Sequence, residues 1–441
     1  MRVTDKTSPG SLPTSAIGRA GVLAAGPVAM YLALFHGVAA AAGAVAICFG
    51  LVVWPRPDVA LLMLLVLVPA VAVVDPGGTA LPVMVLGAVV LLLLRVVLGG
   101  SRLCTDLLLI PSIGAAVTVS WLLPQETFGV EHAWKTCGLL LVGLGLTAVS
   151  ALAPPDPRRI AQVVAGSGGG LATCLVLRGE HAFDRLTGLG LNPNYVGAAL
   201  ALPLVAAVGL VRFNRSWLWM VPAAVCVCAV LETRSRGAFV MAAAGLACVL
   251  LAGRPLRHKV LIGLALLAVT LALPGTLDSM EGNLTGGRTS TELAANTEVR
   301  KKAALLAVRV ALDHPLRGIG YAMFPEYARS SPDLGIYINT HNDYLRLAAE
   351  AGLVTLVLWT ALLWRGLARR RTADHIVLRS LGVSYATGLL FANALTDLVI
   401  STPFWISLGC LLARTADRGP DHLAPQGSPP TPSLRSVRKA E

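Results

Sequence analysis

Long apolar segments alternate with short polar ones along most of the 441-residue chain. A helix needs roughly 20 mostly apolar residues to cross about 30 Å of hydrocarbon, and about fourteen segments approach that length. Runs such as 61–74 and 83–94 are apolar on every side, whereas the strands of a membrane barrel would alternate. The pattern predicts an all-α, polytopic membrane helix bundle of about 12 to 14 transmembrane helices. The predicted spans cover 18–35, 38–54, 58–74, 79–98, 105–123, 133–152, 159–177, 194–211, 216–231, 237–252, 259–274, 344–364, 376–396 and 399–413.

The polar segments divide the chain into five parts. We expect a polar N-terminus, an N-terminal transmembrane bundle of about eleven spans, a large loop, about three C-terminal spans, and a tail. The tail is rich in proline and basic residues, which is typical of disorder. The polar start of the chain does not have the pattern of a cleaved signal peptide, so the first apolar run is expected to begin the bundle. The five parts are 1–17, 18–274, 275–343, 344–413 and 414–441.

The large loop contains a helical pattern of its own. Val299, Ala303, Leu306 and Val310 recur at helical spacing, and basic residues lie between them on the other face. Asn296 or Thr297 is suited to begin the helix, and Pro315 stops it. We therefore predict an amphipathic helix that lies against the bundle or the membrane surface.

Composition and charge narrow the class of protein. Hydrophobic residues make up 55% of the chain and charged residues 14%, against about 25% charged in an average soluble domain. This composition excludes a cytosolic globular enzyme. The net charge of +12 is spread over many short loops, so we expect no nucleic-acid partner.

The distribution of basic residues predicts the orientation. One set of alternate short loops holds fourteen Lys and Arg residues and the other set holds five. By the positive-inside rule the richer set and both termini are cytoplasmic, which places the large loop outside. The prediction is a multi-pass protein of a cytoplasmic membrane, with its functional residues expected at the extracytoplasmic ends of the spans and in the large loop.

Two arginines remain on the outer side, where the positive-inside rule disfavours them. Arg234 and Arg236 lie in a very short turn between two apolar spans. Snorkelling to lipid headgroups would explain a single arginine, but a pair favours an anion site, because the guanidinium fork matches phosphate. Arg288 follows two glycines in the large loop, where the backbone allows close approach to a ligand.

Two further stretches open spans from the outer side. His341 and Asn342 precede the span at 344–364, and a histidine at such a position is either a capping residue or a general base. The helix N-terminus disfavours its protonation and a bound pyrophosphate would favour it, so both protonation states stay open. Asn194 belongs to an Asn-Pro-Asn stretch that a simple helix start explains.

Several patterns are missing from the sequence. It has no Asp-x-Asp pair, no phosphate-binding P-loop and no dinucleotide fingerprint, so we expect no metal and no cofactor. All eight cysteines lie in or beside apolar spans, which predicts no disulfide framework. The energy for any reaction must therefore come with the substrate.

Taken in order, these stretches resemble the O-antigen ligase and polymerase superfamily of bacterial membrane glycosyltransferases. The resemblance extends over about residues 180–365, and the earlier spans match only in hydropathy. The residues that carry it are Asn192-Pro193-Asn194, Ser235-Arg236-Gly237, Gly287-Arg288, Pro315 to Gly320, His341-Asn342 with Leu345, and Glu350-Ala351-Gly352-Leu353.

The resemblance implies a substrate and a mechanism. Such enzymes transfer a glycan from undecaprenyl pyrophosphate to an acceptor hydroxyl on a glycan, a lipid or a protein, without metal or cofactor. It implies that His341 deprotonates or orients the hydroxyl and that Arg288 assists catalysis. Arg234, Arg236 and Arg288 would bind the pyrophosphate, and Asn194 and Asn342 would complete the substrate site.

Alternatives stay open at this point. Lysine supplies only 6 of the 36 basic residues, a usage typical of GC-rich genomes, which include organisms without lipopolysaccharide. A surface-polysaccharide polymerase is then as well supported as a ligase. A lipid-linked glycan flippase or other transporter, or a non-catalytic membrane partner in wall synthesis, would have the same span count. The chain shows no internal repeat of the kind that transporters carry, which favours the enzyme.

Overall fold

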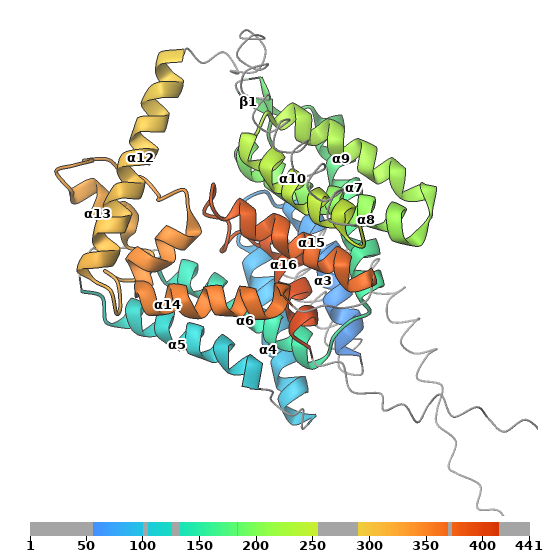
Figure 1. Ribbon diagram of the computed structural model, residues 1–441, viewed down its shortest axis with the longest axis horizontal. Coiled ribbons are helices and arrows are strands. Elements are labelled where there is room, and N and C mark those ends of the chain that lie inside the picture. The colour runs from blue at the N-terminus through green and yellow to red at the C-terminus, as the bar shows by residue number, and fades with distance from the viewer. Residues whose placement is uncertain are drawn as a thin grey trace, which may run out of the picture.

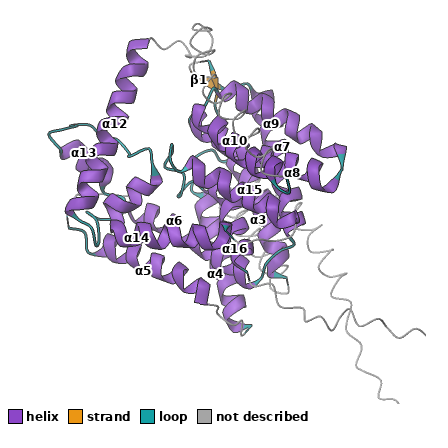
Figure 2. Ribbon diagram, viewed as in Figure 1, coloured by secondary structure: helices purple, strands orange, loops and turns teal. Residues whose placement is uncertain are grey.

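The computed structural model describes residues 56–99, 105–125, 133–182, 184–254, 290–368 and 373–413. These residues form a bundle of helices with one short antiparallel strand pair (Figures 1 and 2). Helices α3 to α10 comprise Pro57–Val74, Ala80–Leu98, Leu109–Leu122, Ala133–Leu152, Pro157–Arg178, Pro193–Asn214, Met220–Thr233 and Arg236–Leu251. Helices α12 to α16 comprise Ser290–Asp313, Phe324–Ser330, Asp343–Leu367, Ala373–Gly388 and Leu398–Leu412. Strands β1 and β2 are His181–Ala182 and Arg185–Leu186, and 3-10 turns precede α5 and α9 at Thr105–Leu108 and Trp217–Trp219.

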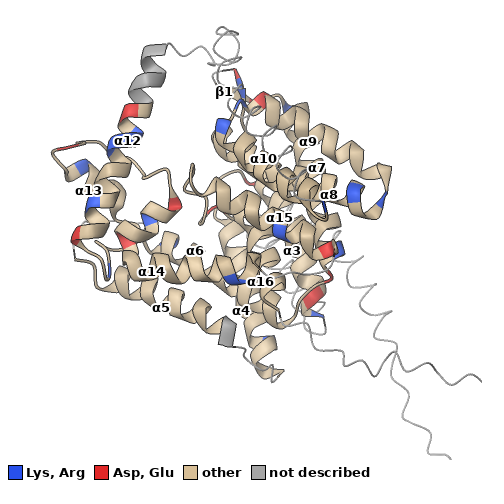
Figure 3. Ribbon diagram, viewed as in Figure 1, with Lys and Arg blue, Asp and Glu red and all other residues tan. Residues whose placement is uncertain are grey.

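The apolar helices confirm the predicted class. Within the described residues, 6 helices are long and apolar enough to cross a membrane, and four shorter apolar helices accompany them. Charged residues are sparse along α3 to α10 and more frequent on α12, α13 and the connections (Figure 3). The chain is therefore an all-α, polytopic membrane protein. The predicted spans 18–35, 38–54 and 259–274 lie outside the described residues, as do the predicted polar N-terminus and the tail.

Small residues bring the central helices close together. Gly143 of α6 faces the indole of Trp405 on α16, and Gly409 of α16 faces the carbonyl of Thr147; a Cβ at either glycine would meet these atoms at 2.3 or 2.4 Å. Trp405 packs in turn against the rings of Trp359 and Phe404 at 5.4 and 5.2 Å between centroids. In membranes, helices associate through such close van der Waals packing, because burying apolar surface gives no driving force when the surrounding lipid is itself apolar. This packing anchors α14, whose N-terminal end carries the candidate site.

The amphipathic helix of the large loop is α12, and it packs on α14 rather than standing alone. Its buried face includes Ala303, Leu306 and Val310, and the last two form a second apolar cluster with Phe324 and Ala349. The helix ends at Asp313 beside Pro315, as predicted. The predicted N-cap at 296 or 297 was wrong, because the helix begins at Ser290 and runs through both positions.

The predicted span at 376–396 was wrong in extent. Helix α15 ends at Gly388, and 389–397 is an irregular connection that returns to α16. Its backbone groups find partners inside the protein: Asp343 N–H donates to the carbonyl of Leu389, and Tyr385 Oη donates to the carbonyl of Ala394. Irregular backbone is tolerated at membrane depth only under such conditions.

Connections that were predicted to be extracytoplasmic meet at one end of the bundle. Gly190 approaches Gly77 so closely that a Cβ would lie 3.2 Å from the Gly77 nitrogen, and Gly320 approaches Pro124 in the same way at 2.8 Å. At the other end, the Arg212 guanidinium donates to the carbonyl of Ala252 at 2.6 Å. The structure therefore sorts the connections into two ends; the side of the membrane that each end faces remains a prediction.

Candidate functional site

His341 lies in a short irregular segment between α13 and α14. Its backbone has a left-handed conformation, with φ of 52°, and its N–H donates to Oδ1 of Asn393 at 2.8 Å. Asn393 Nδ2 donates to Thr340 Oγ1 at 3.1 Å and to Asp343 Oδ1 at 3.2 Å. A residue from the 389–397 connection therefore fixes the segment on both sides of the histidine.

The surroundings of His341 keep its imidazole neutral. Burial, together with the positive charge of Arg300 on α12, lowers the pKa of His341 to about 4. Both effects disfavour the charged form, because a buried cation loses hydration and a nearby cation repels it. At neutral pH the ring therefore has one nitrogen free to accept a proton or a hydrogen bond. Of the two protonation states that the sequence left open, the surroundings favour the neutral one.

Just after His341 in the chain, the first turns of α14 carry a buried ionic cluster. Arg346 Nε donates to Glu350 Oε2 at 3.0 Å, and Arg346 Nη1 lies 3.8 Å from Asp343 Oδ1. The guanidinium also stands 5.2 Å from the ring centre of Tyr321. All four side chains are buried, and buried charges are stable only when they are paired and hydrogen-bonded.

Glu350 joins α14 to the segment that leads from α12. Its carboxylate accepts hydrogen bonds from Ala322 N–H at 2.9 Å and Phe324 N–H at 3.1 Å. Gly318 and Gly352 make this contact possible, because a Cβ at either position would lie 2.3 to 2.4 Å from backbone atoms of the opposite segment. The Pro315 to Gly320 and Glu350 to Leu353 stretches, noted separately in the sequence, therefore pack against each other.

Arg234 and Arg236 occupy the α9–α10 turn, as predicted. Arg234 ends α9 in the left-handed conformation, with φ of 47°, while Ser235 caps α10 by accepting from Ala238 N–H. Arg236 is exposed on the first turn of α10. Arg234 is partly exposed, but its Nη1 is buried and has no hydrogen-bond partner among the described residues. A buried guanidinium nitrogen without an acceptor is suited to an anion.

The two predicted asparagines have structural partners. Asn342 Oδ1 caps α14 by accepting from Tyr344 N–H at 3.0 Å and Leu345 N–H at 3.1 Å. Asn194 Oδ1 accepts from Arg185 Nη2 at 2.7 Å, and Arg185 Nε donates to the carbonyl of Thr233 at 2.9 Å. Both side chains therefore support the scaffold, and their roles in substrate binding stay predictions. Arg288 lies outside the described residues.

A chain of contacts connects the arginine turn to the histidine. Arg185 links Thr233, the neighbour of Arg234, to Asn194 at the start of α8. The next residue, Tyr195, donates from its hydroxyl to the carbonyl of Asn393 at 3.2 Å. Asn393 in turn holds His341. The two predicted elements thus share one scaffold at one end of the bundle.

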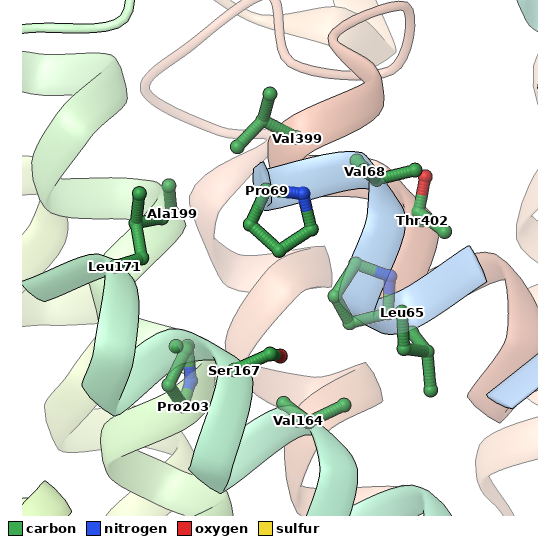
Figure 4. Close-up of a pocket in the computed structure, with 12 residues that line it drawn as sticks. Leu65, Val68, Pro69, Val164, Ser167, Leu171, Ala199, Pro203, Val399 and Thr402 are labelled. Atoms are coloured by element: carbon green, nitrogen blue, oxygen red, sulfur yellow. The ribbon is translucent and has the colours of Figure 1, made fainter. Parts of the chain in front are cut away.

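Two cavities lie in different surroundings. A polar cavity of about 240 Å³ opens beside the His341 segment and is lined by Ala133, Thr136, Tyr195, Ala322, Pro325, Tyr337, Asn339, Arg346, Asn393 and Thr396. A smaller apolar pocket of about 20 Å³ lies among α3, α7, α8 and α16, where Pro69 and Pro203 face it together with Leu65 and Val399 (Figure 4). Among the described residues that line the apolar pocket none is charged, whereas the first cavity is lined by Arg346 and several uncharged polar residues.

Sequence reasoning missed Arg346, Asp343 and Asn393. A signal existed for the first two, because charged residues inside an apolar span are rare and mark functional or structural sites. Asn393 carries no local signal, since its role depends on a contact 52 residues away in the chain.

The fold and the site define a polytopic membrane protein with a polar centre at one end of its helices. Residues 221–360 match the family model described as O-Antigen ligase. The match includes Arg234, Arg236, Arg288 and His341, and it confirms the resemblance to the O-antigen ligase and polymerase superfamily of membrane glycosyltransferases over this segment. No curated protein matches the chain.

Proposed function

We propose that the protein transfers a glycan from undecaprenyl pyrophosphate to an acceptor hydroxyl at the outer face of the bacterial cytoplasmic membrane. The observation that carries the proposal is that a neutral His341, whose backbone is held by Asn393, lies in the same family-matched segment as the arginine turn. A neutral imidazole and unpaired guanidinium donors are the two groups that such a transfer requires.

The reaction is a single displacement. The acceptor oxygen forms a bond to the anomeric carbon of the donor sugar, while the bond from that carbon to the pyrophosphate oxygen breaks. His341 receives or orients the hydroxyl proton, undecaprenyl pyrophosphate leaves, and the anomeric configuration inverts. Arg234, Arg236 and Arg288 stabilise charge on the leaving group, an effect often worth several kcal/mol. Because the cations come from arginine, the proposed mechanism needs no metal.

The low pKa of His341 fits an ordered mechanism. Burial and, to a smaller extent, the Arg300 cation lower this pKa in the ligand-free protein, so a pyrophosphate bound nearby would offset the cation and raise the pKa. His341 would then become a stronger base only when the donor is present. Asn194 and Asn342 would support the site by holding the starts of α8 and α14.

Reconstitution with a lipid-pyrophosphate glycan tests the proposal. Protein in liposomes should give new glycosidic product, and His341→Ala should lower the rate by about 10²- to 10⁴-fold, the usual contribution of a general base. His181→Ala is the matched control, because His181 is exposed on β1 at the same end of the bundle. A variant His341→Ala that is folded and fully active would exclude the catalytic role.

The same assay separates the alternatives. A ladder on one lipid identifies a polymerase, and transfer to a second molecule identifies a ligase. Unaltered donor that crosses the bilayer identifies a flippase. If the assay shows neither a product nor movement of the donor, the non-catalytic role in wall synthesis is the one supported.

A further inference from the structure

The polar cavity beside His341 has the chemistry of a sugar site rather than a phosphate site. Thr136, Asn339 and Thr396 line it from three different segments. Tyr337 adds a ring and a hydroxyl, and 61% of its surface is exposed. Hydroxyl and amide groups both donate and accept, which matches the hydroxyls of a sugar ring.

The charge of the cavity gives little attraction for the pyrophosphate. Arg346 is the one charged residue among the described residues that line it, and two carboxylates already face this guanidinium. Because Glu350 and Asp343 already pair with the single positive charge, Arg346 offers an incoming anion little attraction. The unpaired guanidinium nitrogen of Arg234 lies instead on the α9–α10 turn.

The cavity shares a wall with the histidine segment. Asn393 lines the cavity and accepts the backbone hydrogen bond of His341, and Asn339 lies two residues before the histidine. Its volume of about 240 Å³ is many times the ≈ 10–15 Å³ that one water requires. A ring bound there would place its hydroxyls beside the segment that carries the proposed base.

We infer that this cavity is a subsite for a neutral sugar residue of the glycan substrate, separate from the arginine turn that would take the pyrophosphate. The inference rests on the proposed function for the source of that sugar, which is either the acceptor or the donor glycan. Both sources present the same ring hydroxyls.

A binding measurement that needs no turnover tests the subsite. The probes are neutral disaccharides and inorganic pyrophosphate, titrated into the full-length protein in nanodiscs and followed by calorimetry. Asn339→Trp fills the exposed rim of the cavity and should weaken disaccharide binding about tenfold or more, without affecting pyrophosphate. Pro332→Trp is the control, because Pro332 is exposed in the same α13–α14 connection and does not line the cavity. Arg234→Ala should show the opposite selectivity.

Transfer assays on the same variants identify the source of the sugar. A raised KM for the acceptor alone assigns the subsite to the acceptor, and a raised KM for the donor alone assigns it to the donor glycan. Disaccharides that fail to bind the wild-type protein, or that bind Asn339→Trp equally well, overturn the subsite whatever the transfer assay shows. Disaccharide binding that depends on Asn339 in a protein without transfer activity would overturn the proposed function and leave the subsite intact.

Discussion

The backbone N–H of His341 donates a 2.8 Å hydrogen bond to the side-chain oxygen of Asn393, across 52 residues of sequence. The bond holds the histidine in a left-handed conformation that is uncommon outside glycine, although histidine adopts it more readily than most residues. The amide nitrogen of Asn393 meanwhile holds Thr340 and Asp343. One side chain thus fixes the backbone from residue 340 to residue 343.

Removing that side chain should impair catalysis more than folding. We expect Asn393→Ala to lower kcat by about 10²-fold, because a displacement of about 1 Å at a reacting group has that effect. The free energy of unfolding should fall by about 1–3 kcal/mol, the cost of leaving buried polar groups unpaired. Glycan-transfer kinetics and thermal unfolding of the detergent-solubilised protein check the two values. Unchanged kcat would show that Asn393 does not position His341.

The pH dependence of the reaction should reflect the low pKa of His341. Only the neutral imidazole accepts a proton, so activity is present above this pKa and is lost as the pH falls through it. The acid limb of kcat/KM, which reports the free enzyme, should therefore lie near pH 4. The acid limb of kcat, which reports the enzyme with bound donor, should lie at higher pH, because the negative pyrophosphate offsets the positive charge of Arg300.

Two variants of α12 test the cause of this pH dependence. Arg300→Gln removes the cation that lowers the pKa of His341, so the limb of kcat/KM should move to higher pH. Arg309→Gln is the matched control, because Arg309 lies on the same helix and pairs with exposed Asp333. An unmoved limb in Arg300→Gln would contradict the electrostatic assignment.

The sequence predicted the helices well where the apolar pattern is local, and it failed where distant residues decide. The segment 389–391 has the composition of a span, yet it lies in the connection after α15. Asp343 on α14 holds the backbone of this connection by hydrogen bonds to Leu389 and Leu395. His341 was identifiable from its place before a span. Asn393 was not, since nothing near it in the sequence indicates the hydrogen bonds that it makes.

The arginine turn should require guanidinium groups and not charge alone. We expect Arg234→Lys to lose nearly as much activity as Arg234→Ala, because an ammonium cannot reproduce the donor fork at a buried nitrogen. The same result is expected for Arg236→Lys, because Arg236 is exposed on the same turn. Arg329→Lys, in an exposed pair with Glu326, is the control. Full transfer activity in both lysine variants would reduce the site to general electrostatic attraction.

The orientation of the bundle can be tested by labelling. We expect a membrane-impermeant maleimide to modify Ser330→Cys in intact cells, because Ser330 is exposed at the end of α13, within the loop predicted to be outside. Arg158→Cys, exposed at the start of α7, should react only after the membrane is permeabilised. The protein without an added cysteine gives the background. The reverse pattern would invert the topology and place the candidate site in the cytoplasm.

Glu350 should contribute to stability through its three hydrogen bonds, independently of any substrate. Glu350→Ala removes the acceptor of Ala322, Phe324 and Arg346 and leaves a buried guanidinium with Asp343 alone. Breaking a buried pair in this way costs about 3–5 kcal/mol. Glu326→Ala is the control, because Glu326 pairs with exposed Arg329 and such surface pairs contribute at most about 1 kcal/mol. Thermal unfolding in detergent measures both, and equal midpoints would show that Glu350 does not join α14 to the segment after α12.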